Sequence, residues 1–197
     1  KHFITITLGT GVGSGIVIDG KIVVGHDGFA GELGHTIIRH GGRRHKSTGL
    51  LGSLEAYASA TGVRETAIEM LTEYPETESL LRNYSINELT SESVYDCAMQ
   101  GDTIANRIFE FTGQILGESL ANFIMFSSPE AIVLFGGLTK AGPLLLNPTR
   151  KHMEANLLPI FQNKVKLLFS ELKEADAAIL GASALVWDTM RDAQGDF

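Results

Sequence analysis

The chain has 197 residues, of which 44% are hydrophobic and 20% are charged, a balance typical of a globular domain and not of a disordered chain. Its formal net charge of −7 argues against a nucleic-acid-binding surface in this part of the protein. No apolar run reaches the roughly 18 residues that a membrane-spanning helix needs, and the single cysteine, Cys97, has no partner for an intrachain disulfide. We therefore expect a cytoplasmic protein that does not engage a membrane.

The chain opens on KHFITITLGTG, without an initiator methionine or a signal peptide and with a strand pattern already under way at Phe3. This beginning predicts a piece of a longer protein that has lost an N-terminal portion. Removal of a tag or processing of the terminus would produce the same start.

The first elements are predicted to be strands. Residues 3–8 (FITITL) alternate between aliphatic and threonine side chains, which is strand periodicity. Residues 15–25 hold two β-branched runs joined by Asp19-Gly20, a pair that favours a type I′ hairpin because both central residues need a positive φ. Together they predict an antiparallel meander, and HTIIR at residues 35–39 is predicted to be another short strand before a loop.

The middle of the chain is predicted to be helical. Helices are expected to begin near Leu54, at Thr61 or Gly62, after a cap at Thr90 or Ser91, and after a cap at Asp102. The last of these carries a wide apolar stripe that predicts a core-facing side: Ile104, Ile108, Phe111, Ile115, Leu116, Leu120 and Phe123. Gly113 and Gly117 lie one turn apart on it, which would let another backbone approach closely.

The C-terminal third has α/β character. Residues 131–135 form a fully apolar strand that ends in Gly136-Gly137 and is followed by a helical pattern, as in strands buried on both faces. A further strand is predicted at residues 165–169 and a closing helix at residues 177–190.

Two glycine turns are candidates for phosphate contact. LGTGVGSG, directly after the first strand, offers successive backbone N–H groups and the Thr10 hydroxyl, which suit a phosphate. It lacks the Gly-Lys-Ser/Thr of a Walker loop, and a strand follows it where a dinucleotide motif has a helix. The bend either binds phosphate or is a tight hairpin. Gly136-Gly137 is either a second nucleotide contact or a strand-to-helix turn.

Acidic and histidine side chains flank a basic, glycine-rich loop. Glu32 stands three residues before His35 in GELGH, and Glu55 lies at the start of the helical pattern. Carboxylates are strong acceptors for sugar hydroxyls. The same residues also have structural readings: a turn cap for Glu32, a core histidine for His35, and a first-turn carboxylate favoured by the helix dipole for Glu55.

Five motifs then occur in one order along nearly the whole chain: LGTGVGSGIVIDGK, GFAGELGHT, GSLEAYASATG, PEAIVLFGGLTKAG and AAILGASAL. In this order they resemble the ROK family of sugar kinases and sugar-responsive repressors. The resemblance implies the actin-like (ribonuclease H-like) ATPase fold of two α/β domains around a cleft. This chain would be the larger, C-terminal domain, with residues 1–176 binding sugar and nucleotide and residues 177–197 returning to the missing N-terminal domain.

The resemblance implies a kinase that transfers the γ-phosphoryl of ATP, with Mg²⁺, to a hydroxyl of a glucose-type hexose. It assigns sugar contacts to Glu32, His35 and Glu55. It assigns nucleotide contacts to Gly9, Thr10, Gly11, Gly13, Gly136 and Gly137. Two alternatives stay open: the sugar-sensing domain of a repressor whose DNA-binding part lies elsewhere, and a degenerate domain that has lost its affinity for sugar.

Two departures from the family limit that carry-over. Three zinc-binding cysteines of the family are replaced here by Lys46, Thr48 and Ser53, and an ammonium with two hydroxyls does not replace thiolates on zinc. We therefore expect the loop without its metal. The family's first phosphate loop and catalytic aspartate lie upstream of the LGTG motif, so no catalytic residue is assigned and the chain alone is not expected to catalyse.

The predicted closing helix carries an apolar set that water would disfavour: Ile179, Leu180, Leu185, Val186 and Trp187. We expect it to pack on this domain, to swap, or to be buried in a dimer. Members of the family are commonly oligomers, so a homo-oligomer is expected.

Overall fold

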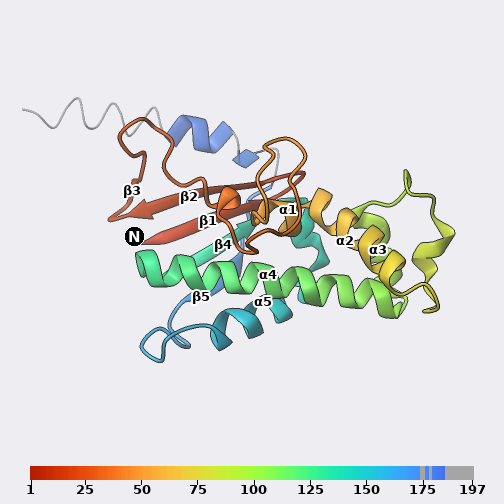
Figure 1. The fold of residues 1–197 in the computed structure, drawn as a ribbon. Helices are drawn as coiled ribbons and strands as arrows, with labels where there is room; N and C mark the ends of the chain where they lie inside the picture. Colours follow the sequence, from red (N-terminus) through yellow and green to blue (C-terminus); the bar gives the residue numbers. More distant parts are fainter. Residues whose placement is uncertain (174–175, 178, 185–197) are drawn as a thin grey trace, which may run out of the picture.

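The computed structural model describes residues 1–173, 176–177 and 179–184. Its centre is a five-stranded mixed sheet in the order β3-β2-β1-β4-β5. The strands are β1 (Phe3–Leu8), β2 (Val12–Ile18), β3 (Lys21–Ile22), β4 (Ala131–Phe135) and β5 (Lys166–Phe169). β1 pairs antiparallel with β2 and parallel with β4 (Figure 1), so the predicted meander joins a parallel α/β half at β1.

The hairpin between β2 and β3 turns where the sequence predicts it. Asp19 and Gly20 have φ values of 52° and 81°, as a type I′ turn requires. The first strand also has the predicted alternation, because Ile4, Ile6 and Leu8 are buried while the threonines between them are not.

The helices follow the predicted starts closely. They are α1 (Glu55–Ala58), α2 (Ala60–Glu73), α3 (Ser91–Met99), α4 (Thr103–Ser127) and α5 (Pro143–Ala155), with short 3₁₀ turns η1 (Leu33–His35), η2 (Leu80–Asn83) and η3 (Gly137–Ala141). Thr90 and Ser93 form a capping box at α3. Asp102 caps α4 by accepting from the Ala105 N–H at 2.8 Å.

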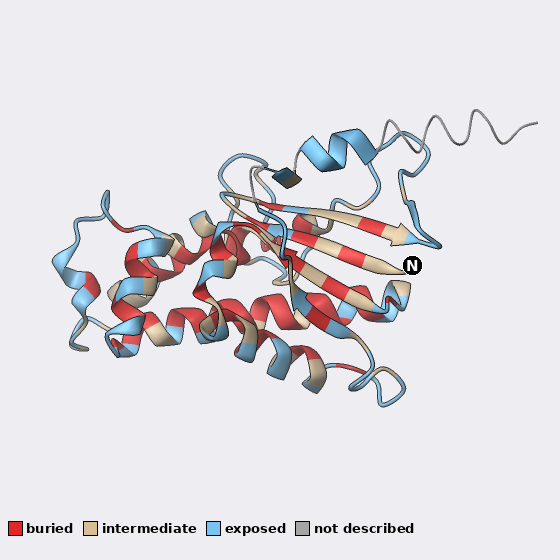
Figure 2. Ribbon diagram, turned by 180° about the vertical axis from the view of Figure 1, so that it is seen from behind, coloured by how far each residue is buried: buried red, intermediate tan, exposed pale blue. Residues whose placement is uncertain are grey.

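The core lies between the sheet and the two long helices. α4 and α5 run side by side along one face of the sheet (Figure 1), and the buried residues concentrate there (Figure 2). The two glycines of α4 allow the predicted close approach: a Cβ at Gly117 would stand 2.4 Å from the Thr149 carbonyl oxygen, and one at Gly113 only 2.6 Å from Pro148. The helices α1 to α3 gather at the end of the sheet where β1 ends.

Two predictions about strands are wrong. Residues 35–39 form no strand: His35 ends η1, and Ile37 makes one isolated bridge to Ser53. The segment curls tightly around Gly52, whose carbonyl accepts from the N–H groups of both Ile38 and Arg39, so it cannot run straight beside a partner. β4 is fully buried on one face only, since Ile132 and Leu134 are inaccessible while the residues between them are half-buried.

The predicted closing helix is described only in part. Residues 176–177 and 179–184 are helical, and Ile179 and Leu180 are 71% and 53% exposed. These two side chains therefore do not pack on the described part of this domain. Leu185, Val186 and Trp187 lie outside the described residues, and the division of the chain at residue 176 stays a prediction.

Candidate sugar and nucleotide site

The bend between β1 and β2 is held by the start of α2. The Gly9 carbonyl accepts from the Ala60 N–H at 2.8 Å, and the Thr10 carbonyl accepts from the Thr61 hydroxyl at 3.0 Å. Within the described residues, the N–H groups of Thr10 and Gly11 find no acceptor. The bend therefore has two neighbouring N–H donors to offer to an anion, at the end of a strand that the core holds rigid.

Glu55 closes the bend from the other side. Its Oε2 accepts from the Val12 N–H at 2.7 Å, and only 13% of its side chain is exposed. A Cβ at Gly11 would stand 2.4 Å from that same oxygen, so glycine is the residue that lets the carboxylate approach. The carboxylate is thus ordered by the backbone before any ligand arrives, a form of preorganisation.

His45 is the functional neighbour that the sequence analysis did not assign. Its Nε2 lies 3.0 Å from Glu55 Oε1, and its Nδ1 lies 2.9 Å from the Thr48 hydroxyl oxygen. The ring therefore bridges the carboxylate and the hydroxyl, with one nitrogen on each. In the sequence this histidine stands inside the basic run GRRHK, and its distance along the chain from Glu55 matches no known motif.

The predicted sugar ligands lie in one row with His45 between them. The His45 ring centroid is 6.4 Å from that of His35, and His35 Nε2 lies 3.7 Å from Glu32 Oε2. Glu32 differs from Glu55 in its setting, because 65% of its side chain is exposed. The structure therefore brings all three predicted residues to one region, with Glu55 fixed and Glu32 open to solvent.

Two cavities meet at Thr10. The first, of about 390 Å³, lies between the bend, Glu55 and the basic run of residues 43–47. The second, of about 490 Å³, lies between the bend, α3 and η3, and its lining includes Gly9, Tyr95, Gly137 and Lys140. Thr10 lines both. We call them the loop cavity and the α3 cavity.

The two other predicted glycines have different places. Gly136 has φ 99°, and a Cβ there would stand 2.6 Å from the Leu8 carbonyl oxygen, so it is the strand-to-helix turn that packs on β1. Gly137, its neighbour, lines the α3 cavity. Gly13 lies within β2 opposite Thr7 and lines neither cavity. Its predicted nucleotide contact stays a prediction.

The loop that carries the family's zinc cysteines elsewhere does not fit zinc in this chain. Lys46 pairs with Glu65 at 2.8 Å, and Thr48 contacts His45. His35 Nδ1 and Ser53 Oγ are buried without a hydrogen-bond partner among the described residues. Among the described residues no three His, Cys, Asp or Glu side chains cluster in a way that could hold a metal ion.

Glu65, near the loop, and the buried Cys97 are among the described titratable groups whose pKa is shifted. The Lys46 hydrogen bond, more than the charges of Arg64 and Arg43, lowers the pKa of Glu65. Burial raises the pKa of the Cys97 thiol, with the nearby Asp102 charge acting in the same direction. Cys97 therefore lacks the low pKa that makes a cysteine reactive.

Among the helices that the structure describes, none is both long and apolar enough to cross a membrane.

Comparison with known proteins agrees with this fold. A solved ROK family glucokinase from Streptomyces griseus, in complex with glucose and AMPPNP, superposes with a TM-score of 0.78 at 30% identity, covering 87% of this chain and 56% of that one. The mixed sheet and its helices are therefore the actin-like α/β fold of the ROK sugar kinases. The family model described as ROK family matches residues 1–189. The chain belongs to the ROK family.

Curated relatives include both enzymes and regulators. A glucokinase from Halalkalibacterium halodurans is 39% identical over 187 residues, which cover 94% of this chain and 56% of the relative. The DNA-binding transcriptional dual regulator NagC of Escherichia coli is 28% identical over 183 residues, which cover 93% of this chain and 43% of the regulator. The chain thus spans about half the length of the curated relatives it matches.

Proposed function

We propose that this chain is the sugar- and nucleotide-binding part of an ATP-dependent kinase for a glucose-type hexose. The observation that supports the proposal most is the position of Thr10, which borders the cavity of Glu55 on one side and the cavity of Gly137 on the other. A phosphoryl group that passes from nucleotide to sugar has to cross between two such sites, and backbone N–H groups at the crossing would hold it.

At the sugar end, Glu55 lines the loop cavity, and Glu32 and His35, which line neither cavity, would contact non-reacting hydroxyls from outside it. Glu55 is the best placed of them, because its carboxylate is oriented by the Val12 N–H and by His45. A charged acceptor fixed in this way gives a hydroxyl a charge-assisted hydrogen bond at little entropic cost. Two curated relatives are glucokinases, which supports a sugar of the glucose type.

At the nucleotide end, the Thr10 N–H group and the turn at Gly137 would contact a polyphosphate, while Gly11 lines the loop cavity. The α3 cavity has the room, and its wall carries the Lys140 cation beside the carboxylates of Glu92 and Asp96. Mg²⁺ would enter with the nucleotide, because it is usually held by phosphates and water with few protein ligands. When bound, ATP supplies the phosphoryl group, and this chain's residues would position it.

The chain alone is proposed to bind both ligands without transferring phosphate. Transfer needs a carboxylate that accepts the proton of the reacting hydroxyl. Glu32 and Glu55 are proposed for other hydroxyls, so the base would come from the rest of a longer kinase. We also propose that the protein acts in the cytoplasm as a homo-oligomer, to which the exposed Ile179 and Leu180 would contribute buried surface.

A sugar-sensing role in a repressor is the second candidate, because ROK repressors also match nearly the whole chain. Both roles use the sugar row, and the acidic charge of −7 leaves DNA binding to another part of such a protein. Nucleotide binding in the α3 cavity would distinguish the two roles, since a kinase has to bind ATP and a sugar sensor does not.

Calorimetry on this chain tests the proposal. We expect a panel of hexoses to give measurable binding of glucose, and a non-hydrolysable ATP analogue with Mg²⁺ to bind in addition. Glu55→Gln should weaken glucose binding by about tenfold or more, because it removes a charged hydrogen-bond partner. Glucose binding without nucleotide binding would favour the repressor. Binding of neither ligand would favour the degenerate domain.

A further inference from the structure

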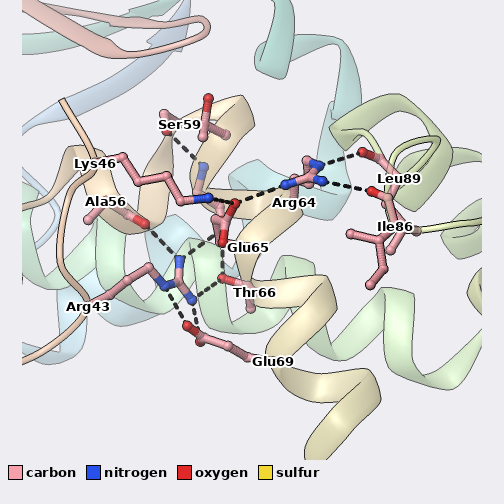
Figure 3. A network of polar contacts seen from close by, with 12 residues as sticks. Arg43, Lys46, Ala56, Ser59, Arg64, Glu65, Thr66, Glu69, Ile86 and Leu89 are labelled. Carbon is pink, nitrogen blue, oxygen red and sulfur yellow. Dashed lines mark hydrogen bonds and ion pairs between the residues drawn. The ribbon is translucent and has the colours of Figure 1, made fainter.

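The loop of residues 39–52, which we call the site loop, carries His45 to Glu55 and is fastened to α2 by charge. Figure 3 shows two cations of this loop, Arg43 and Lys46, reaching across to acidic residues of α2. Lys46 Nζ lies 2.8 Å from Glu65, and the Arg43 guanidinium contacts both oxygens of Glu69. The loop therefore has an anchor that depends on no metal.

Arg43 uses every donor of its guanidinium. Its Nε and Nη2 donate to the Glu69 carboxylate at 2.8 and 2.5 Å, and Nη2 also donates to the Thr66 hydroxyl at 2.9 Å. Nη1 donates to the carbonyls of Ala56 and Gly62 at 2.7 and 3.0 Å. A guanidinium has five N–H groups, so none is left over, and only 10% of the side chain is exposed. A side chain with every donor bonded and little exposure is held more firmly than the side chains of an exposed ion pair.

The same residue is also fixed from its own backbone. The Arg43 N–H donates to the Tyr57 hydroxyl at 2.6 Å, and the guanidinium carbon lies 4.6 Å from the centroid of the Tyr57 ring. The Arg43 carbonyl accepts from the Gly52 N–H at 2.8 Å, which closes the base of the site loop. Arg43 thus joins the two ends of the loop to α1 and α2 at once.

His45 stands between the two anchors. It is one residue from Lys46 and two from Arg43, and its N–H donates to the Leu50 carbonyl at 2.8 Å across the loop. With its backbone held in this way, the ring points at Glu55, and Nε2 lies 3.0 Å from Glu55 Oε1. Arg43 and Lys46 therefore fix the position of His45, and His45 in turn orients the Glu55 carboxylate.

We propose that Arg43, assisted by Lys46, is a positioning residue for sugar binding: it holds His45 against Glu55 and replaces, by hydrogen bonds and ion pairs, the zinc that the family uses in this loop. The proposal deepens the proposed function and rests on it for the sugar, whereas the claim about the loop stands on the contacts alone.

The test combines amide hydrogen exchange by NMR with glucose calorimetry on the same variants of this chain. Arg43→Ala should speed exchange at His45, Gly49 and Gly52 in the loop, and at Val12, whose N–H is held by Glu55. It should also weaken glucose binding about tenfold. Arg43→Lys keeps the charge and loses the forked guanidinium, so its exchange rates and glucose affinity should lie between those of the wild type and Arg43→Ala. Lys151→Ala, which removes a remote exposed ion pair with Glu110, is the matched control and should leave both readouts unchanged.

Each result decides a separate claim. Exchange at these four amides equal to that of the Lys151→Ala control would overturn the anchoring role, whether or not the chain binds glucose. Faster exchange with unchanged glucose affinity would overturn the positioning role. In the wild-type chain, EDTA should alter neither exchange nor affinity, and loss of protection on chelation would show that a metal holds the loop. If the wild-type chain binds no glucose, the proposed function fails, and the exchange rates still decide the anchor.

Discussion

The bend at residues 9–11 and the site loop at residues 39–52 border the same cavity, but only the loop is also fastened by side-chain charge. The bend is held by bonds to its backbone carbonyls from the start of α2, and it follows Leu8, against whose carbonyl Gly136 packs where no side chain would fit. The loop adds to its own backbone hydrogen bonds two side-chain ion pairs with α2, Arg43 on Glu69 and Lys46 on Glu65. Both act on Glu55, one through the Val12 N–H and the other through His45.

The difference teaches how a binding site tolerates the loss of a metal. A backbone contact needs glycine at one position and admits few substitutes. A charged anchor requires only that two long side chains reach each other, so it can arise at new positions on a loop and a helix that already face one another. The metal-binding side chains can then change while Glu55 keeps its place.

The largest expected effect would break the backbone side of the comparison. Gly136→Ala should lower the free energy of unfolding by about 3 kcal/mol, because its Cβ would overlap the Leu8 carbonyl and its φ of 99° strains any other residue. Urea unfolding measures this. Gly9→Ala is the control: nothing lies within 4 Å of that Cβ, so a change below about 0.5 kcal/mol is expected. Equal losses in both variants would refute the close-packing argument.

A smaller loss of stability with a clear loss of binding is expected at Gly11. Gly11→Ala places a Cβ 2.4 Å from Glu55 Oε2, and the carboxylate, being the end of a flexible side chain, can swing away. We expect glucose affinity to fall about tenfold while stability falls by less than about 1.5 kcal/mol. Calorimetry and urea unfolding on one sample separate the two. Unchanged affinity would mean that the position of Glu55 does not matter for sugar.

The charged side of the comparison predicts a dependence on pH. The Lys46 hydrogen bond lowers the pKa of Glu65 below its ordinary 4.5 in the folded chain. The stabilisation by this pair is therefore complete above pH 4.5 and is lost as the pH falls through the lower folded value. In Lys46→Met the pKa of Glu65, followed by NMR titration, should rise. A pKa of Glu65 that stays where it was would assign the shift to Arg64 instead.

The smallest effect is expected at an exposed ion pair between α4 and α5, remote from the site. Lys151 and Glu110 approach to 2.8 Å, but 68% and 50% of their side chains are exposed. Lys151→Ala should change the free energy of unfolding by less than about 0.5 kcal/mol. A thermal or urea melt that shows a loss comparable to that of Arg43→Ala would remove the distinction between a buried, fully bonded guanidinium and a surface pair.

Sequence reasoning succeeded where local chemistry decides the structure. The alternation at Phe3–Leu8, the Asp19-Gly20 turn and the Asp102 cap each depend on a few neighbouring residues, and all three are confirmed. It failed at residues 35–39, where β-branched residues predicted a strand. There the Gly52 carbonyl accepts from both Ile38 and Arg39 and bends the segment. Tertiary contacts overrode the local preference there.

The candidate site was predictable only in part, and for a different reason. Glu32, His35 and Glu55 could be named because five motifs in a fixed order carry a family resemblance. His45 and Arg43 could not, because their partners, Glu55 and Glu69, lie 10 and 26 residues away and no spacing rule links them. Their roles became visible only with the contacts of the folded chain.

NMR titration of the amide signals of this chain, first with glucose and then with a non-hydrolysable ATP analogue and Mg²⁺, tests the central claim most directly. The account predicts that glucose shifts the signals around Glu55 and His45, that the nucleotide shifts those of Gly9 and Gly137, and that Thr10 responds to both. If the two ligands shift the same set of residues, or if neither moves Thr10, then the two cavities are not the two halves of a phosphoryl-transfer site.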